Sequence, residues 1–280
     1  MNSRKYSAIL FLILTLFLPS LSQAKENSAT CIQTFNAYGP WYAPNLNERT
    51  KKLGEYLDDN PCDILLLQEV WLSAHKEQLK EILIDQGFNV FHFDNIGLSG
   101  RIFGLMTAVK GSIEGQGFFE FDENYKGFMD YIRKSFYVAK GVGLLKVKLP
   151  QLDKSLFIVN THLHHSDINI RASQVAQLLL NVEELNQEGL SVIMGGDFNL
   201  EPFSESYKTI ATRFVSQSPK TMCTYCEKNP LAWGFDDKDI DHIFVSSDLI
   251  PSVLSEEIGP KKWQGSYLSD HYGVRLYLRL

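Results

Sequence analysis

Residues 191–199 read SVIMGGDFN, an apolar run that gives way abruptly to glycine, acid and amide. Side chains alternate between the two faces of a strand, so Asp197 and Asn199 share one face while Phe198 points to the other, into the core. An acid beside an amide can hold a hard cation and a water molecule, and the two glycines let a phosphate approach the backbone closely. An ordinary Asx turn after a strand is the alternative interpretation of the same residues.

The same arrangement, an apolar strand next to polar side chains, recurs along the chain. The runs and their polar neighbours are Thr30–Phe35 with Asn36, Asp63–Leu67 with Gln68 and Glu69, Leu156–Val159 with Asn160, Thr161 and His162, Ile240–Val245 with Asp241, and Gly273–Leu278 with Asp270 and His271. Side chains at strand ends can converge on one edge of a sheet, so these polar residues are candidates for a shared site.

Helical patterns fall between these runs. The stripes at helical spacing are Leu46, Leu53 and Leu57; Leu79, Ile82 and Leu83, with Gly87 as a helix stop; and Val175, Leu178, Leu179, Val182 and Leu185. Several strands are apolar on both faces, as expected when helices cover one side of a sheet and a second sheet covers the other. The sequence therefore predicts an α/β fold, a four-layer α/β sandwich of two packed mixed β-sheets flanked by helices. Gly111–Gly117 is predicted to be a loop within a single domain.

The first 24 residues have the composition of an export signal. Arg4 and Lys5 precede an apolar run, and the small residues before and at Ala24 offer a cleavage site. The run is shorter than the ~20 apolar residues that a membrane-spanning helix needs. We expect a signal peptide over residues 1–24, a catalytic domain over residues 25–280, and a secreted or periplasmic protein.

Charge and cysteine content limit the classes of function. The chain has 27 Lys and Arg against 33 Asp and Glu, a net charge of −6, which argues mildly against a large non-specific grip on nucleic acid. Cys31 and Cys62 each stand at the start of a predicted strand, so a bridge between them is plausible in an oxidising compartment. Cys223 and Cys226 are interpreted as a local disulfide or two free thiols; a zinc half-site lacks a second pair.

The polar residues favour a divalent cation bound through oxygen. Glu69 follows a buried strand, where an unpaired charge is costly, so a cation or a basic partner is expected beside it. The run of histidines at His162, His164 and His165 raises zinc as an alternative, but the helical His-x-x-x-His pattern is absent and the acids suit Mg²⁺ better. His164 and His165 also have a simple interpretation as surface histidines.

Asp270 and His271 predict acid–base chemistry assisted by a distant carboxylate. Adjacent residues of an extended segment point in opposite directions, so Asp270 is badly placed to orient His271 and is available to a metal. Asp241 could accept the proton of one His271 nitrogen and leave the other to take a proton from water. Asp239 lies two residues earlier on the same face, and spacing alone does not choose between the two.

Six segments in chain order resemble the motifs of the endonuclease/exonuclease/phosphatase superfamily. They are Thr34-Phe35-Asn36, Gln68-Glu69-Val70, Thr161-His162-Leu163, Gly196-Asp197-Phe198-Asn199, Ile240-Asp241-His242-Ile243 and Ser269-Asp270-His271. The resemblance implies a four-layer sandwich that hydrolyses phosphate esters with Mg²⁺. Carried onto matching positions, it implies these roles: Glu69 on the metal with Asn36 beside it, Asp197 and Asn199 on water and phosphate, His162 at the transition state, and His271 as general base oriented by Asp241.

Within that superfamily the chain looks closest to the neutral sphingomyelinases. The similar segments are Asn36-Ala37-Tyr38-Gly39, the Leu-Gln-Glu-Val-Trp that ends at Trp71, and Ala139–Leu145. This resemblance implies hydrolysis of sphingomyelin to ceramide and phosphocholine at a phospholipid membrane surface. Lys140 and His164 are the predicted substrate-binding residues, although Lys140 could equally be a solvated strand-edge charge.

Other functions and partners stay open at this point. A secreted nuclease, a phosphatase acting on inositol lipids and a catalytically dead membrane-binding module are the rival functions. Nucleic acid is the less favoured partner, and no obligate protein partner is predicted. The aromatic segment Phe118–Val138 could enter a lipid interface or serve as core packing.

Overall fold

The computed structural model describes residues 29–93, 103–124, 139–216, 223–234 and 236–280. The predicted signal, residues 1–24, and the part of the aromatic segment over residues 125–138 lie outside the described residues. Within the described ranges, no helix is both long enough and apolar enough to cross a bilayer.

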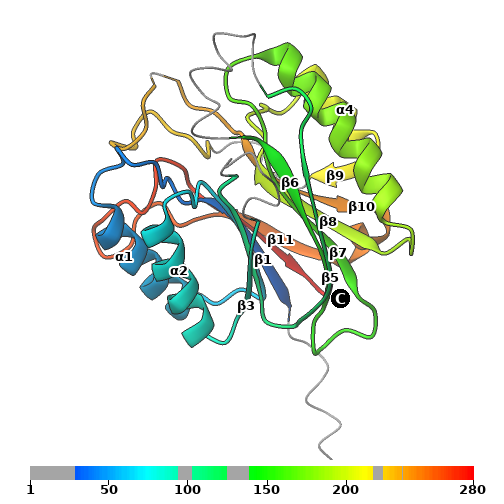
Figure 1. Ribbon diagram of the computed structural model, residues 1–280, viewed down its shortest axis with the longest axis horizontal. Helices are drawn as coiled ribbons and strands as arrows, with labels where there is room; N and C mark the ends of the chain where they lie inside the picture. Colours follow the sequence, from blue (N-terminus) through cyan, green and yellow to red (C-terminus); the bar gives the residue numbers. More distant parts are fainter. Residues whose placement is uncertain (1–28, 94–102, 125–138, 217–222, 235) are drawn as a thin grey trace, which may run out of the picture.

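Within the residues that the structure describes, twelve strands form two six-stranded sheets, which pack face to face (Figure 1). In chain order they are β1 (Thr30–Asn36), β2 (Ile64–Gln68), β3 (Asn89–Phe93), β4 (Leu105–Val109), β5 (Ser112–Glu120), β6 (Gly141–Lys148), β7 (Leu156–His162), β8 (Ser191–Asp197), β9 (Phe214–Ser216), β10 (Asp241–Ser246), β11 (Val253–Ile258) and β12 (Val274–Leu278). One sheet has the order β11-β12-β1-β2-β4-β3 and the other β5-β6-β7-β8-β10-β9. Both are mixed, because β1 pairs with β2 and β7 with β8 in parallel while the other pairs are antiparallel.

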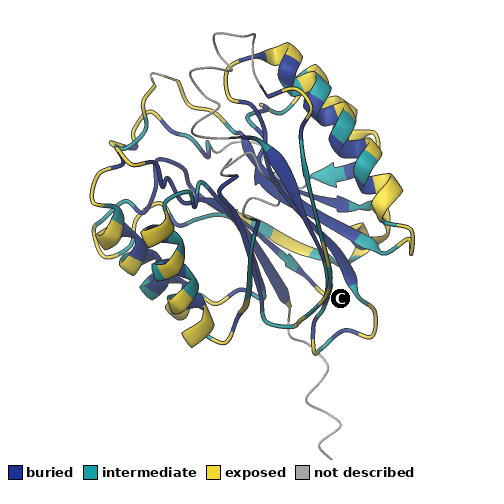
Figure 2. Ribbon diagram, viewed as in Figure 1, coloured by how far each residue is buried: buried dark blue, intermediate teal, exposed yellow. Residues whose placement is uncertain are grey.

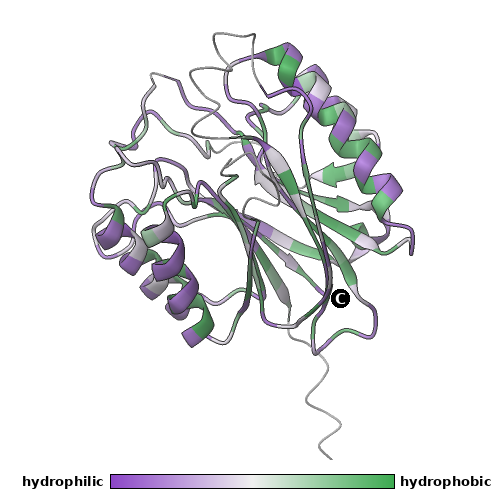
Figure 3. Ribbon diagram, in the orientation of Figure 1, coloured by the Kyte–Doolittle hydropathy of each residue, from purple (hydrophilic) through white to green (hydrophobic). Residues whose placement is uncertain are grey.

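Helices cover the outer face of each sheet (Figure 1). Helices α1 (Leu46–Asp59) and α2 (Ser73–Asp85) lie against the first sheet, and α4 (Ile168–Leu185) and α5 (Glu205–Ala211) against the second. One apolar core fills the space between the sheets, and another lies under each helix layer. The central strands are buried and largely apolar, whereas the edge strands β3, β5 and β11 are partly exposed and the outward faces of the helices are exposed and polar (Figures 2 and 3). The predicted four-layer sandwich is confirmed.

Strand direction brings the polar residues to one edge of the sandwich, here called the polar edge. Parallel pairing aligns Asn36 with Gln68 at the ends of β1 and β2, and His162 with Asp197 at the ends of β7 and β8. Antiparallel β10 begins where β8 ends, so Asp241 lies opposite Asp197. Strand β12, which is antiparallel to β1, also begins at this edge.

The prediction of a loop at Gly111–Gly117 was wrong, because most of that segment belongs to strand β5. Gly115 and Gly117 pair with Lys146 and Leu144 of β6. Glycine has a low preference for strands, but backbone pairing along the edge of an existing sheet outweighs that preference.

The three predicted helices are confirmed, with one error in a stripe. Gly87, with a φ of 84°, follows the last turn of α2 as expected of a helix stop. In α4 the apolar residues from Val175 to Val182 are buried, but Leu185 is 51% exposed. Leu185 is the last residue of the helix, where the sheet no longer covers it.

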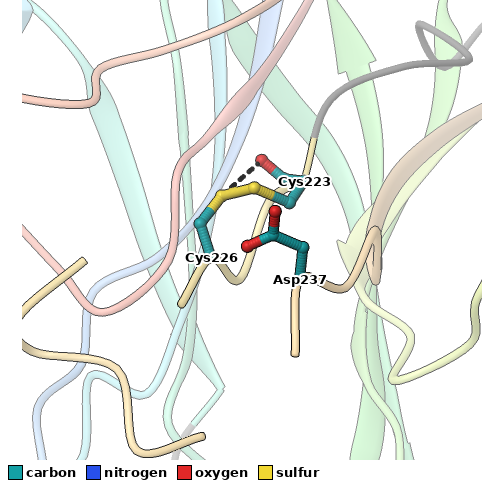
Figure 4. Close-up of side chains that lie close together, drawn as sticks. All are labelled: Cys223, Cys226 and Asp237. Carbon is teal, nitrogen blue, oxygen red and sulfur yellow. Dashed lines mark hydrogen bonds between the residues drawn. A yellow bond between two sulfur atoms is a disulfide. The ribbon is translucent and has the colours of Figure 1, made fainter. Parts of the chain in front are cut away.

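Two disulfides staple the described chain. Cys31–Cys62 joins β1 to the residues just before β2, in line with the predicted bridge. Cys223 and Cys226 are bonded to each other, and Asp237 lies beside them (Figure 4). The disulfide excludes a zinc half-site at these two cysteines, because sulfur atoms joined in a disulfide are not available as thiolate ligands.

Candidate active site

A cavity of about 310 Å³ opens at the polar edge. Its walls come from both sheets and from the segment before β10, and they consist of Glu69, His162, His165, Arg171, Asp197, Asn199, Glu201, Tyr225, Trp233, Lys238, Ile240 and His271. Five residues singled out from the sequence therefore line one cavity, although up to about two hundred positions separate them in the chain.

His271 is paired with Asp241 rather than with Asp239. The His271 Nδ1 atom lies 2.7 Å from Asp241 Oδ2, and the Asp241 side chain is fully buried. This short contact assigns the Nδ1 hydrogen as the donor to the carboxylate. The other ring nitrogen, Nε2, lies 3.7 Å from Asp197 Oδ2 on the cavity side.

The charges around His271 favour its protonated form. Burial by itself lowers the pKa of the imidazole, but the carboxylates of Asp241, Asp197 and Asp270 more than offset that effect and raise the pKa well above its usual value. A positive charge placed among these acids would reverse the shift and free His271 to accept a proton.

Asp197 connects the residues on the floor of the cavity. Its Oδ2 accepts a hydrogen bond from Asn36 Nδ2 at 3.1 Å and lies 3.3 Å from His162 Nε2. Its Oδ1 accepts from the backbone N–H of Asn199 at 3.0 Å. Burial, together with the charge of Asp241, raises the pKa of the Asp197 carboxyl to about 6.

His162 is held as a neutral imidazole. Burial lowers its pKa well below the usual value, and the positive charge of Lys140 lowers it further. A neutral ring carries one N–H, which the contact with Asp197 places on Nε2. Asn199, at a left-handed φ of 51°, donates one amide hydrogen to the Leu163 carbonyl, so its second hydrogen is available to the cavity.

Glu69 and Asp270 are the candidate oxygen ligands for a divalent cation. Burial raises the pKa of Glu69 to about 7, and the charge of Asp270 contributes, while Lys140 and His271 act in the opposite direction. Burial also raises the pKa of Asp270. A half-buried and a buried carboxylate whose charged forms are disfavoured fit a hard cation such as Mg²⁺, and Asn36 donates to the neighbouring Asp197.

The backbone around Glu69 is constrained by close packing. Glu69 has a φ of 60°, in the left-handed region that non-glycine residues rarely adopt. A Cβ atom on Gly39 would lie 2.2 Å from the Glu69 carbonyl oxygen and 2.5 Å from His75 Nδ1, so only glycine fits there. Arg49 ties the segment after β1 to the segment before Asp270 by donating to the carbonyls of Ala37, Tyr38 and Leu268.

The two predicted substrate-binding residues have different positions. Lys140 is partly buried just before β6, and its charge acts on Glu69, His162 and Asp197. His164 is only 3% exposed, so its interpretation as a surface histidine was wrong.

The geometry does not support contact between His164 and a substrate. The His164 Nδ1 atom accepts hydrogen bonds from the backbone N–H groups of Ser166 and Asp167, in the turn that leads into α4. The exposed neighbour His165 lines the cavity in its place.

Several cavity residues were missed from the sequence, because they follow no strand. Tyr225, Trp233 and Lys238 come from the segment that contains the second disulfide, and Arg171 comes from the first turn of α4. Bridges from Tyr225 to both Lys238 and His271 anchor that segment against the site, and the Tyr225 ring lies 5.1 Å from the His271 ring. The position of Tyr225 inside Cys-x-x-Cys was the available signal, since a disulfide fixes the residues that it encloses.

Comparison with known proteins gives one family match and several distant relatives. Residues 34–271 match the model of the "Endonuclease/Exonuclease/phosphatase family". The chain is 26% identical to an inositol phosphosphingolipids phospholipase C of Schizosaccharomyces pombe, over 76% of this chain and 51% of the relative. It is also 26% identical to a putative neutral sphingomyelinase of Drosophila melanogaster, over 89% of this chain and 60% of the relative. The chain thus spans about half the length of the curated relatives it matches.

Solved structures share the fold at low sequence identity. An endonuclease/exonuclease/phosphatase from Bacteroides vulgatus aligns with a TM-score of 0.73 and 20% identity, over 91% of this chain and all of that one. TDP2 of D. rerio, complexed with a single-strand DNA product, aligns with a TM-score of 0.69 and 17% identity, again over 91% of this chain and all of the other. At such identities the likeness establishes the fold alone.

Proposed function

Since the chain belongs to the endonuclease/exonuclease/phosphatase family, we propose that it is an exported, Mg²⁺-dependent phosphodiesterase that hydrolyses sphingomyelin to ceramide and phosphocholine. The single observation that carries this proposal is the His271–Asp241 contact of 2.7 Å, with the second nitrogen of His271 facing a cavity that Glu69 also lines. A histidine oriented in this way is suited to take a proton from water.

Water attack is the central step of the proposed reaction. A water molecule held beside Asp197 gives a proton to His271 Nε2 as its oxygen bonds to phosphorus, and Asp241 stabilises the imidazolium that forms. The bond from phosphorus to the ceramide oxygen breaks on the opposite side, that oxygen takes up a proton from solvent, and His271 returns its own proton to solvent. The products are an alcohol and a phosphomonoester.

Hydrogen-bond donors on the cavity floor stabilise the charge that develops on the phosphoryl oxygens. The free amide hydrogen of Asn199 is a donor for this role, whereas the single N–H of neutral His162 is directed to Asp197. A divalent cation bound by Glu69 and Asp270, with Asn36 beside them, would supply Lewis-acid chemistry at the phosphoryl group.

Two curated relatives support a sphingolipid diester as the substrate. One is named for the hydrolysis of inositol phosphosphingolipids and the other as a putative neutral sphingomyelinase. Both names describe cleavage of a sphingolipid phosphodiester, which is the bond class that the proposed water attack would break. The identities near 26% leave the headgroup to experiment.

Export is supported by the amino-terminal composition and by the disulfides. Residues 1–24 combine basic residues, an apolar run and a small-residue cleavage site. Both pairs, Cys31–Cys62 and Cys223–Cys226, are oxidised, as is typical of secreted and periplasmic proteins. Edman sequencing of protein recovered outside the cytoplasm should begin at Lys25; accumulation of the full-length chain in the cytoplasm would contradict export.

A side-by-side substrate assay tests the proposed activity. Purified mature protein with Mg²⁺ receives sphingomyelin vesicles, phosphatidylcholine vesicles, DNA and an inositol phosphate, and the soluble products are quantified. We expect phosphocholine from sphingomyelin, and loss of that product when EDTA is added. Release of acid-soluble nucleotides from DNA without phosphocholine from sphingomyelin would show that the protein is a nuclease instead. Hydrolysis that continues after metal removal would refute the Mg²⁺ requirement.

A further inference from the structure

Four large aromatic side chains of the described chain are exposed, and all four lie in loops at the polar edge. Trp41 and Tyr42 follow β1, Phe203 follows β8, and Trp233 lines the cavity. Their exposed fractions are 75%, 57%, 73% and 82%, respectively. We call these four side chains the aromatic rim.

Contacts join Trp41 to Tyr42, and connect Trp233 to residues beside the cavity. The Trp41 and Tyr42 rings meet edge to face at 5.6 Å. Trp233 donates a hydrogen bond to the hydroxyl of Tyr38, and its backbone N–H donates to the hydroxyl of Tyr225. The rim is therefore attached to the same loops that carry the cavity walls.

Phe203 occupies a backbone position that disfavours its side chain. The residues Glu201-Pro202-Phe203-Ser204 form a turn, in which the Ser204 N–H donates to the Glu201 carbonyl at 3.2 Å and Phe203 has a φ of 73°. Glycine is the usual residue at this position of such a turn, because a left-handed φ strains a bulky side chain. Packing of the ring against this chain does not offset the strain, because 73% of the residue is exposed. We infer that the ring contacts something outside the chain.

We propose that the aromatic rim docks the protein onto the interface of a phosphocholine bilayer, a proposal that rests on the proposed lipid substrate. Amphipathic rings such as Trp and Tyr favour the boundary between headgroups and acyl chains. Docking through the rim turns the mouth of the cavity toward the headgroups. Of the earlier candidate segment, Phe118, Phe119 and Phe121 instead pack against other aromatic rings or into the core.

Charge favours a zwitterionic surface over an anionic partner. The chain carries a net charge of −6, which opposes adsorption to acidic lipids and to nucleic acid. The rim itself consists of uncharged side chains, so its binding should depend little on ionic strength. A phosphocholine bilayer, which has no net charge, meets both conditions.

Vesicle flotation with a double variant tests the docking surface. Trp41→Ala combined with Phe203→Gly removes two rings that do not line the cavity, and the glycine also relieves the strained φ. The matched control is Ile84→Ala with Leu254→Ala, which removes exposed apolar groups from the far end of α2 and the start of β11, away from the polar edge. We expect the rim variant to bind phosphatidylcholine–sphingomyelin vesicles about tenfold more weakly or worse, and the control to bind like the wild type.

Two further measurements separate docking from catalysis. Hydrolysis of the water-soluble diester bis(4-nitrophenyl) phosphate should be equal in the wild type and the rim variant, while hydrolysis of vesicle sphingomyelin should fall with binding. If the wild type bound vesicles but cleaved no diester, the proposed function would be refuted and the proposed docking surface would still stand.

Three outcomes would overturn the docking surface. One is wild-type vesicle affinity in the rim variant. Another is stronger binding of the wild type to phosphatidylserine vesicles than to zwitterionic ones. The third is that the wild type binds a single-stranded oligonucleotide and not vesicles, and that the rim variant loses this binding. That result would make the rim a base-stacking surface.

Discussion

The contact between His271 and Asp241 fixes a proton on one nitrogen of the imidazole. Replacing Asp241 with Asn keeps the shape of the side chain but allows its amide to donate to Nδ1, which stabilises the wrong tautomer. We expect kcat on a phosphodiester to fall by about two to four orders of magnitude. Steady-state kinetics measure the loss, and circular dichroism melts check folding. Asp239→Asn is the control, because Asp239 does not contact His271; equal losses in both variants would refute the assignment.

Glu69 provides a test of metal binding that is independent of activity. Any ion that binds only the folded state raises the melting temperature by mass action, so Mg²⁺ should stabilise the wild type and have little effect on Glu69→Gln. The folded-state pKa of Glu69 is raised to about 7, so without metal its ionised form destabilises the fold above that pH. We therefore expect Glu69→Gln to melt at a higher temperature than the wild type at pH 8 in EDTA. If Mg²⁺ raised the melting temperature of the variant as much as that of the wild type, Glu69 would not be a ligand of the ion.

At the scale of elements, a buried polar contact joins the two sheets directly beneath the site. Gln68 at the end of β2 donates to Asn160 Oδ1 in β7 at 2.8 Å, and Asn160 donates to the carbonyls of Leu67 and Met106. Both side chains are fully buried. This contact sets the distance between β2, which Glu69 follows, and β7, which carries His162.

Removing Asn160 should therefore damage both stability and catalysis. Asn160→Ala removes one acceptor of the Gln68 amide and the donor to the carbonyls of Leu67 and Met106, which costs about 2–4 kcal/mol of unfolding free energy. Urea denaturation measures this cost, and kinetics on the folded fraction should show a lower kcat. Asn181→Ala, which removes a partly exposed amide on α4, should change stability by less than about 0.5 kcal/mol. Equal losses of unfolding free energy in the two variants would show that the inter-sheet contact does not contribute more to stability than an ordinary surface amide.

Element prediction succeeded where apolar periodicity was strong and failed where backbone pairing decided. The stripe from Val175 to Val182 predicted α4, because a helix with one apolar face can only be buried against something. Strand β5 was predicted as a loop, since its glycines carry no strand signal and its pairing partner β6 lies far along the chain. The burial of His164 was also missed from the sequence. The turn that leads into α4 buries this side chain, and the neighbouring residues do not predict that turn.

At the scale of the whole molecule, Glu256 is a buried acid that the site does not use. Burial raises the pKa of its carboxyl to about 8, and the charge of Asp239 contributes. Among the described residues its two carboxylate oxygens have no hydrogen-bond partner. An acid whose folded-state pKa is raised binds more protons when folded than when unfolded, so its contribution to stability falls as pH rises from about 4.5 through about 8.

Glu256→Gln should therefore flatten the alkaline side of the stability curve. We expect the variant to melt about 3 °C or more above the wild type at pH 8.5, and the difference to shrink toward pH 5. Differential scanning calorimetry across that range, in EDTA, gives the comparison. The exposed Glu184→Gln on α4 should track the wild type at every pH. A difference that grows toward low pH would show that the sign of the argument is wrong.

Sequence patterns predicted the layers and most of the candidate site residues. Apolar strands and striped helices can be buried only in a layered sandwich, and polar side chains at strand ends have no role in such a core, so Glu69, Asp197 and His271 stood out. Tertiary structure alone decided which residues meet. The inclusion of Tyr225 in the cavity wall and the exposure of Phe203 depend on loops whose paths are fixed by contacts with distant strands, and local sequence patterns do not encode such contacts.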